Sequence, residues 1–245
     1  MATKRKKKLA WLKFWVIAIP SFFTINWCYH AINKPSEVIG LFDSHFYNSP
    51  RNTWQNLGSD FKDHSTSIIT SDFLAALAQT ETQGNPIART YWQWSFSTNP
   101  FKIFAPASSA AGLFQITDGT YAQMKRFCIH NGEVVKDGPW YEIGSCWFNF
   151  AYNRLIPSHA IEMTAAYLDY HVTKLIKRYR GAPPNTQQKQ ELAAIIHLCG
   201  PQRGEQFVRN RFQLASIGNC GAHNPHAYVN KLKKLQSGFS NSRNN

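Results

Sequence analysis

The chain has 245 residues, which is enough for one or two domains. With 43% hydrophobic residues, 14 Gly and 12 Pro, its composition is that of a globular protein and excludes a collagen, a coiled coil or a wholly disordered chain. Its formal net charge of +13, from 27 Lys and Arg against 14 Asp and Glu, raises the question of a polyanionic or acid-surfaced partner.

The positive charge is concentrated at the N-terminus. Residues 1–13 hold six of the 27 Lys and Arg and no acid, so the remaining 21 stand against 14 acids, an excess of only seven. A nucleic-acid-binding domain would carry clustered Lys and Arg within its fold, whereas the body of this chain is only moderately basic. We therefore expect no nucleic-acid partner.

A mostly apolar stretch, Phe14–Cys28, follows the basic run. About 15 residues are fewer than the 17–25 of a spanning helix and closer to the core of a signal peptide. No small-x-small cleavage site follows, however, and Trp27 precedes Cys28 where a lipoprotein signal has a small residue. We expect residues 1–31 to be an uncleaved membrane anchor or a cleaved signal segment, with lipid attachment the least favoured option. The positive-inside rule places the rest of the chain across the membrane from the basic run.

Cysteine usage agrees with export. Outside the apolar segment there are four cysteines, and pairing neighbours in sequence predicts the disulfides Cys128–Cys146 and Cys199–Cys220, with separations of 18 and 21 residues. No Cys-x-x-Cys or His-x-x-x-His spacing is present, so we expect no metal site.

Helical spacing of apolar residues dominates the chain after residue 66. It predicts a helix that begins at Asp72, with Ser71 as its cap, and ends at Gly84–Pro86. Further helices are expected over Ala160–Tyr179, Gln188–Leu198 and His226–Leu235.

Alternating strand patterns are nearly absent. The exception is Gly132–Gly138, in which Asp137–Gly138 is a candidate hairpin turn. The chain is therefore predicted to be mainly α, and we divide it into a membrane anchor or signal segment (1–31), a linker or N-terminal extension (32–65), a helical domain (66–236) and a flexible tail (237–245).

Glu81 is the first candidate for catalysis. It lies four residues after Leu77 and seven after Leu74, so on a helix it faces the same way as the apolar stripe. Burial and the dipole at a helix C-terminus both favour the protonated form, which suits a general acid. The alternative is a glutamate at a frayed helix end that turns to solvent.

The segment Ser108–Thr117 is the second candidate. Its small residues and Gly112 allow close approach of the backbone, and Gln115 can bind amides and hydroxyls. A glycine-flanked helix start in the core would show the same pattern.

Together, Gln79–Pro86 (QTETQGNP) and Ala110–Gln115 (AAGLFQ) resemble the hallmark motifs of the SLT-type lytic transglycosylases, Glu-Ser-x-x-Asn-Pro and Gly-Ala-x-Gly-Leu-Met-Gln. Pro157–Leu168 and Tyr228–Leu232 are similar to two later helices of that family. The resemblance covers roughly residues 66–236 and implies a lysozyme-like (goose-type) helical fold with a small hairpin insertion. It implies Glu81 as the catalytic acid and a substrate site formed by Gln115, Ser109, Gly112, Leu113, His197 and Tyr228.

The third motif departs from the family. Where the family has Ala-Tyr-Asn-Ala-Gly-Pro, this chain has Ile196–Pro201 (IHLCGP), so His197 replaces the tyrosine that supports the acid. His197 either donates a hydrogen bond in its place or is a core residue, and Tyr152 is a second candidate for that support. The serine upstream of the second motif is Ser108 or Ser109.

Two segments are longer than in the family. The first separates Glu81 from Gln115 and either extends a saccharide groove or builds a small core of its own, since it carries Tyr91, Trp92, Trp94, Phe96, Phe101 and Phe104. The second, Cys128–Tyr152, is interpreted as a flap tied by a disulfide.

The resemblance implies a peptidoglycan lytic transglycosylase, a lyase that forms a 1,6-anhydromuramyl product with Glu81 as the single acid and base and without a cofactor. The expected partners are peptidoglycan strands, the inner membrane through the N-terminal segment and, as an option, an envelope-spanning machinery. We expect a monomer in the bacterial cell envelope, anchored on the periplasmic side of the inner membrane or free in the periplasm.

Two alternatives remain open. A hydrolytic muramidase or chitinase-like enzyme on the same fold would need a second carboxylate, for which Glu162 and Asp118 are candidates, although both are also explained as solvated positions. A non-catalytic wall-binding module would retain the groove without the chemistry.

Overall fold

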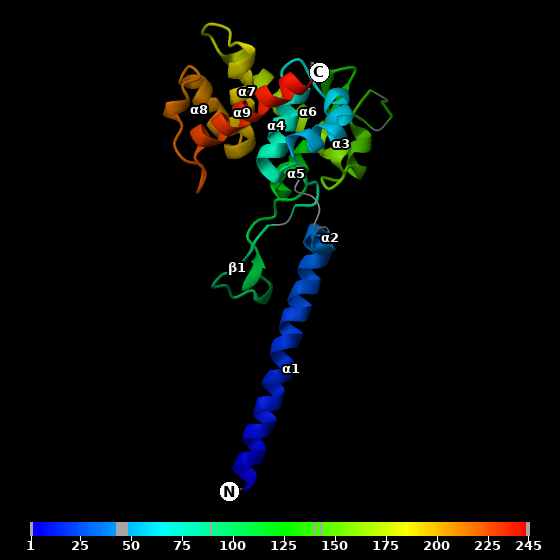
Figure 1. Cartoon of the computed structure of the whole chain (residues 1–245), viewed down its shortest axis with the longest axis vertical. Helices are drawn as coiled ribbons and strands as arrows, with labels where there is room; N and C mark the ends of the chain where they lie inside the picture. Colours follow the sequence, from blue (N-terminus) through cyan, green and yellow to red (C-terminus); the bar gives the residue numbers. More distant parts are fainter. Residues whose placement is uncertain (1, 43–48, 89, 140, 143, 244–245) are drawn as a thin grey trace. The chain divides into compact units, whose positions relative to one another are not determined.

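The computed structural model describes residues 2–42, 49–88, 90–139, 141–142 and 144–243 and is mainly helical, which confirms the predicted class (Figure 1). The chain divides into two compact units. The smaller holds residues 1–43 and 89–109, and the larger holds residues 44–88 and 110–245. The aromatic segment after Glu81 therefore groups with the N-terminal segment rather than with the helical domain in which the sequence analysis placed it.

The larger unit is an assembly of helices around a buried central helix, α4 (Ser71–Thr82). Every residue from Ser71 to Gln79 is buried, because small and aliphatic side chains on all sides of α4 let neighbouring helices approach it from every direction. The helices that accompany it are α3 (Pro50–Asp63), α5 (Asp118–Met124), α6 (Pro157–Arg178), α7 (Thr186–Cys199), α8 (Pro201–Arg209) and α9 (Pro225–Arg243).

Helix α4 packs mainly against α9 and α3, and α6 packs against α7. Two short 3-10 helices, η2 (Trp147–Ala151) and η3 (Leu214–Ser216), lie in the connections. The predicted helices from Asp72, Ala160, Gln188 and His226 correspond to α4, α6, α7 and α9, with ends that differ by one to several residues.

Strands β3 (Phe127–His130) and β4 (Glu133–Lys136) form the predicted hairpin in a different register. Its turn is Asn131–Gly132, where both residues have positive φ, and not Asp137–Gly138. Asn–Gly is the preferred pair for a turn of this kind because both central residues must adopt left-handed conformations. Both predicted disulfides are confirmed, and Cys128–Cys146 ties β3 to the start of η2.

Two segments of the predicted organisation contain more regular structure than their sequence indicated. Part of the expected linker 32–65 is helix α3, in which Ser49 is the N-cap, Pro50 is the first residue and Phe61 is fully buried. Ser followed by Pro opens a helix as readily as it makes a turn. The expected flexible tail is helical to Arg243, because Phe239 is buried in the core and anchors the last turns of α9. Residues 244 and 245 lie outside the described part of the chain.

The smaller unit contains helix α1 (Ala2–Asn33), helix α2 (Ser36–Phe42) and an antiparallel hairpin of β1 (Trp92–Trp94) and β2 (Phe104–Pro106) around the 3-10 helix η1 (Pro100–Lys102). Trp92 pairs with Pro106 and Trp94 with Phe104. The sequence analysis did not anticipate this hairpin, because its strands are only three residues long. Among the residues described, no helix combines the length and the apolar character needed to cross a membrane.

Replacing Phe239 with Ala tests the packing of the last turns of α9. Loss of this fully buried ring should lower the free energy of unfolding by about 3–5 kcal/mol. The exposed Asn241→Ala, two residues along the same helix, should change it by less than about 0.5 kcal/mol. Urea unfolding followed by circular dichroism measures both, and equal midpoints for the two variants would contradict the burial of Phe239.

Candidate active site

Glu81 lies in the last turn of α4, one turn after the fully buried Leu77. The helix ends because Gln83 and Gly84 adopt positive φ and return their N–H groups to carbonyls of the last turn. A Cβ on Gly84 would lie 2.2 Å from Oγ1 of Thr53, so only glycine fits where the chain leaves α4. The side chain of Glu81 is 16% exposed, which confirms that it faces inward and excludes a frayed, solvent-facing glutamate.

Two helices bring side chains to the carboxylate of Glu81. The hydroxyl of Tyr228, on α9, donates a hydrogen bond to Oε1, and Nε2 of His197, on α7, lies 3.4 Å from the same oxygen. The ammonium group of Lys231, one turn after Tyr228, donates to the carbonyl oxygen of Thr80, beside Glu81, at 3.0 Å. Three helices that are distant in sequence therefore meet at one carboxylate oxygen.

These contacts reverse the expected protonation of Glu81. Burial by itself raises the pKa of a carboxyl group, but His197, the Tyr228 hydroxyl and the charge of Lys231 outweigh it, and the pKa of Glu81 lies below its ordinary value. The expectation of a raised pKa is thus wrong, because helix spacing predicts burial but not the partners that other helices supply. Burial and the carboxylate of Glu81 together hold the pKa of Tyr228 well above its ordinary value, so Tyr228 remains a hydrogen-bond donor.

The Cys199–Cys220 disulfide links the elements that carry these two partners. Cys199 ends α7 two residues after His197, and Cys220 precedes α9, on which Tyr228 lies. Closing a loop of this size removes about 3 kcal/mol of chain entropy from the unfolded state. The crosslink therefore restricts how far α7 and α9 can separate around Glu81.

The second motif adjoins the end of α4. The carbonyl oxygen of Leu113, a fully buried residue, accepts a hydrogen bond of 2.9 Å from Oγ1 of Thr82, the residue after Glu81. Gly112 has positive φ, and a Cβ there would lie 2.0 Å from the carbonyl oxygen of Arg154. Gly112 and Leu113 thus hold the motif against its neighbours, and their part in binding substrate stays a prediction.

Gln115 and His197 line the same cavity. Gln115 has positive φ, and its Nε2 donates to the carbonyl oxygen of Gly112 at 3.1 Å. The cavity has a volume of about 290 Å³, and its polar lining is uncharged apart from any proton on His197: Gln115, Thr117, Thr120, Gln123, Tyr167 and His197. Hydroxyl and amide groups of this kind suit a ligand that is itself rich in hydroxyls and amides.

A larger hollow, of about 720 Å³, lies between the β3–β4 hairpin and the end of α6. Its lining includes Tyr170, Lys174 and Lys177 and none of the predicted site residues. We place the candidate site at the smaller cavity, because that cavity shares His197 with the Glu81 cluster.

Ser108 and Ser109 fall at the end of the smaller unit, and the larger unit resumes at Ala110. The carbonyl oxygen of Ser108 accepts a hydrogen bond from Lys34 at 3.0 Å, within the smaller unit. A role for Ser109 in substrate binding stays a prediction.

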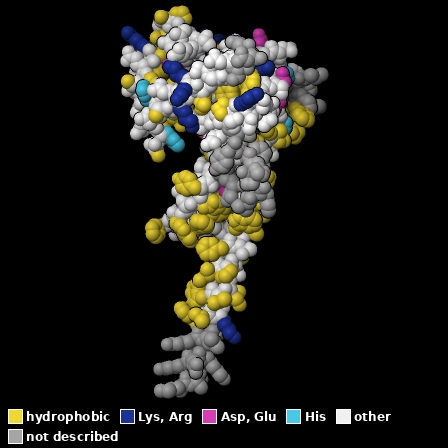
Figure 2. Space-filling model, viewed as in Figure 1, with side chains coloured by type: hydrophobic (Ala, Val, Ile, Leu, Met, Phe, Trp, Pro, Cys, Tyr) yellow, Lys and Arg dark blue, Asp and Glu magenta, His cyan; other side chains and the backbone are white. Residues whose placement is uncertain are grey.

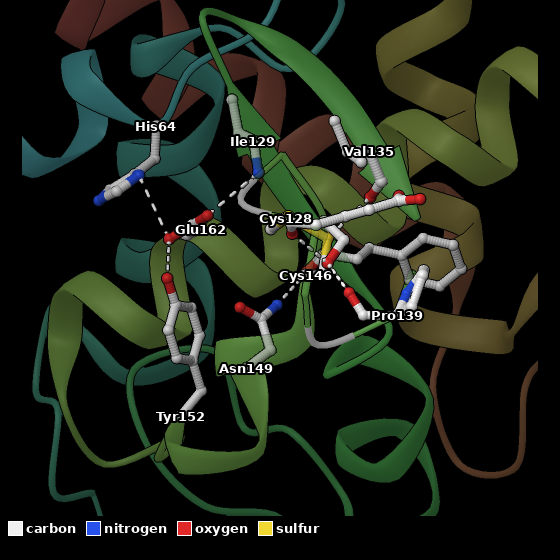
Figure 3. Close-up of a disulfide and its surroundings, with 12 residues drawn as sticks. His64, Cys128, Ile129, Val135, Pro139, Cys146, Asn149, Tyr152 and Glu162 are labelled. Atoms are coloured by element: carbon white, nitrogen blue, oxygen red, sulfur yellow. Dashed lines mark hydrogen bonds and ion pairs between the residues drawn. A yellow bond between two sulfur atoms is a disulfide. The ribbon is translucent and has the colours of Figure 1, made fainter. Parts of the chain in front are cut away.

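Tyr152 does not support Glu81. Its hydroxyl donates to Oε2 of Glu162 at 2.6 Å (Figure 3). Its ring stacks on His159. Burial and the neighbouring Glu162 raise the pKa of Tyr152. Of the two residues considered for the support of Glu81, His197 is the one that contacts it, and the supporting tyrosine is Tyr228.

Glu162 is not a solvated helix position. It is buried, and it accepts hydrogen bonds from Tyr152 and, at 3.0 Å, from the backbone N–H of Ile129, with Nδ1 of His64 at 3.8 Å (Figure 3). Glu162 therefore joins α6 to β3 and to the end of α3. The other proposed second carboxylate, Asp118, is 70% exposed and pairs with Arg154.

The sequence analysis did not identify Lys231 as a neighbour of Glu81, and it expected Tyr228 to bind substrate rather than to donate a hydrogen bond to Glu81. The only available signal was the spacing of Tyr228 and Lys231, which places both on one face of a helix.

Within the described ranges, no group of three or more His, Cys, Asp or Glu side chains could hold a metal ion. No known protein family, curated protein or solved structure matches the chain.

Replacing His197 with Gln tests the origin of the lowered pKa of Glu81. The variant removes the imidazole and should raise the pKa of Glu81, whereas His223→Gln, at an exposed position, should leave it unchanged. A carboxyl carbon titration by NMR measures this directly. An unchanged pKa in His197→Gln would show that His197 does not stabilise the carboxylate.

The lowered pKa of Glu81 also makes the free energy of unfolding depend on pH. Because the pKa of Glu81 is lower in the folded chain, its carboxylate stabilises the fold above the unfolded-state pKa and loses that contribution as the pH falls through the folded-state value. The His197→Gln variant should therefore lose less stability on acidification than the parent chain.

Proposed function

We propose that this chain is a peptidoglycan lytic transglycosylase with a lysozyme-like domain over roughly residues 66–236, in which Glu81 is the single acid and base. The observation that carries the proposal is the cluster at Glu81, a carboxylate at a helix end that is only 16% exposed and has Tyr228 and His197 on one oxygen. The resemblance of the two motifs around Glu81 and Gln115 supports the same assignment.

In the proposed reaction, protonated Glu81 gives its proton to the glycosidic oxygen between N-acetylmuramic acid and N-acetylglucosamine, and the C1–O bond breaks. The N-acetyl carbonyl of the substrate stabilises the cationic C1. The Glu81 carboxylate then takes the proton of the muramyl C6 hydroxyl as O6 bonds to C1, which closes the 1,6-anhydro ring and regenerates the acid. One protein carboxylate is sufficient, whereas direct hydrolysis ordinarily uses a pair.

The contacts of Glu81 bear differently on the two halves of this reaction. Tyr228, His197 and Lys231 stabilise the carboxylate, which is the form that acts as the base in the second half. In the free site Glu81 is ionised at neutral pH, so the first half needs a proton that acidic conditions or the exclusion of water by bound sugar would favour. We expect the rate to rise as the pH falls below 7.

The substrate side rests on the cavity that contains Gln115 and His197, whose uncharged donors and acceptors suit N-acetyl and hydroxyl groups. The excess of seven positive charges outside residues 1–13 favours approach to a cell wall rich in carboxylates. We place the protein in the bacterial envelope, with the N-terminal segment at the inner membrane and the larger unit on the periplasmic side. The two disulfides fit an oxidising compartment.

Mass spectrometry of sugars released from purified peptidoglycan sacculi tests the proposal. The Glu81→Gln variant keeps the shape of the side chain and removes its proton, so release of 1,6-anhydromuramyl products should fall by at least about 10²-fold. The matched change Glu205→Gln, at an exposed ion pair on α8, should leave the release unchanged. Binding to sacculi without any product from the parent chain would instead identify a wall-binding module.

A second pair of variants separates the lyase from a hydrolase. Glu162→Gln should lower the free energy of unfolding by about 1–3 kcal/mol, because it disturbs a buried hydrogen-bonded carboxylate, yet should keep the anhydro product of the folded fraction. Asp118→Asn should change neither quantity appreciably. If the parent chain instead released sugars with reducing muramyl ends, and either variant abolished that release, the protein would be a hydrolase with a second carboxylate.

A further inference from the structure

The smaller unit is built by contacts between residues far apart in sequence. Asn26 of α1 is 1% exposed, and its Nδ2 donates to the carbonyl oxygen of Phe104 in β2 at 2.6 Å. One turn later on the same helix face, Nε2 of His30 lies 2.8 Å from the carbonyl oxygen of Phe101. The hairpin therefore covers two polar side chains of a mostly apolar helix.

A buried ion pair continues this interface beyond the end of α1. Lys34 lies 3.1 Å from Glu37, and its ammonium group also donates to Oγ1 of Thr90 at 2.7 Å. Nε1 of Trp92 donates to Oε2 of Glu37 at 2.9 Å. Burial opposes the ionisation of Glu37, but the hydrogen bonds from Trp92 and Lys34 hold its pKa below the ordinary value. The hydrogen bond between Trp92 and Glu37 thus joins β1 to α2, and the one between Lys34 and Thr90 joins the end of α1 to the residues before β1.

Aromatic rings fill the remaining contact. Phe101 stacks on Tyr29 with ring centroids 4.3 Å apart, and Phe104 packs against Trp92, Trp94 and Phe23. Of the two interpretations of the aromatic insertion, the small core describes these residues, and the helix that completes this core is α1.

Retention of α1 follows from these contacts. Cleavage within a signal segment ending near residue 31 would remove Tyr29 and Phe23, which pack on Phe101 and Phe104. The hairpin would then lose its two hydrogen bonds to α1 and most of its aromatic contacts. The structure therefore favours the uncleaved anchor over the cleaved signal peptide.

Three aromatic side chains of the insertion remain outside this core. Tyr91 is 74% exposed, Trp94 is 65% exposed and Phe96 is fully exposed. Hydrophobic side chains are also exposed along α1, including Phe14, Val16 and Ile17. Figure 2 shows hydrophobic side chains on one face of the helix and the hairpin. Exposed hydrophobic side chains along a helix favour an apolar environment around that part of it.

The charge of the N-terminal segment favours a lipid surface as that environment. Six Lys and Arg and no acid lie in residues 1–13, which suits an anionic membrane surface. The apolar stretch of α1, Phe14–Cys28, rises about 21 Å at 1.5 Å per residue, which is less than the roughly 30 Å of a hydrocarbon core. Trp and Tyr concentrate at membrane interfaces, and the hairpin that carries Tyr91 and Trp94 packs on Phe23 and Tyr29 of this helix.

We propose that the hairpin 91–107 is a membrane-interface element folded on a retained N-terminal helix, and that Tyr91, Trp94 and Phe96 enter the headgroup region of a phospholipid bilayer. The insertion in the larger unit's sequence thereby serves the membrane and not the saccharide. This inference does not depend on the chemistry at Glu81, and its test requires no enzymatic activity.

The test places a fluorophore on the hairpin of the full-length chain. Phe96→Cys in a Cys28→Ser background offers one reactive thiol, because the other four cysteines form disulfides, and the full exposure of Phe96 means that its loss leaves the fold intact. An NBD label at this position is compared with one at the exposed Gln202→Cys on α8. Both chains are reconstituted in vesicles of phosphatidylethanolamine with a minority of phosphatidylglycerol.

Lipids that carry a nitroxide near the headgroup should quench the label at position 96 at least about threefold more than the label at position 202, and aqueous iodide should show the reverse order. Equal quenching at both positions would overturn the proposal. Protection from iodide without quenching by the lipid would also overturn it, and would indicate a second copy of the chain or a saccharide surface as the occupant.

A separate measurement tests whether α1 is retained in the mature protein. The intact mass of the protein purified from the envelope of its producing cells should include residues 1–31. A mass that corresponds to cleavage within or just after this segment would overturn the proposal, since α1 would then be missing from the mature chain.

Discussion

One oxygen atom, Oε1 of Glu81 on α4, is contacted by side chains from both α7 and α9. A carboxylate inside a helical assembly is costly unless hydrogen bonds and charges compensate it, and here the compensation comes from α7 and α9. Those two helices must reach the end of α4 together, and the Cys199–Cys220 disulfide limits their separation. The buried helix α4, which packs against α9, is therefore both the centre of the core and the support of the site.

The parts of the fold that sequence predicts are those controlled by local pattern. Apolar spacing at 3.6 residues locates α4, α6, α7 and α9, and cysteine spacing yields both disulfides. Glu81 itself is predictable because its register relative to Leu77 is a property of one helix. Helix α3 and the last turns of α9 escape prediction because their polar composition hides single anchors, Phe61 and Phe239, whose burial depends on neighbouring helices.

The electrostatics of the site are not a local property. The dipole of α4 and the burial of Glu81 both predict a raised pKa, yet partners more than a hundred residues away reverse the direction. The same holds for Glu162, which looks like a surface residue in the sequence but is fixed by Tyr152 and Ile129. Side chains that act through long-range contacts become visible only when the helices are placed in space.

The hydrogen bond between Asn26 and Phe104 joins residues that are 78 positions apart, which has a consequence for biosynthesis. At a synthesis rate of about 5–20 residues per second, roughly 4–16 s separate the appearance of the two residues on the ribosome. During that interval α1 exists without the hairpin that covers Asn26 and His30. The smaller unit can therefore be completed only after its hairpin has been made, although residues 44–88, which separate its two segments, belong to the larger unit.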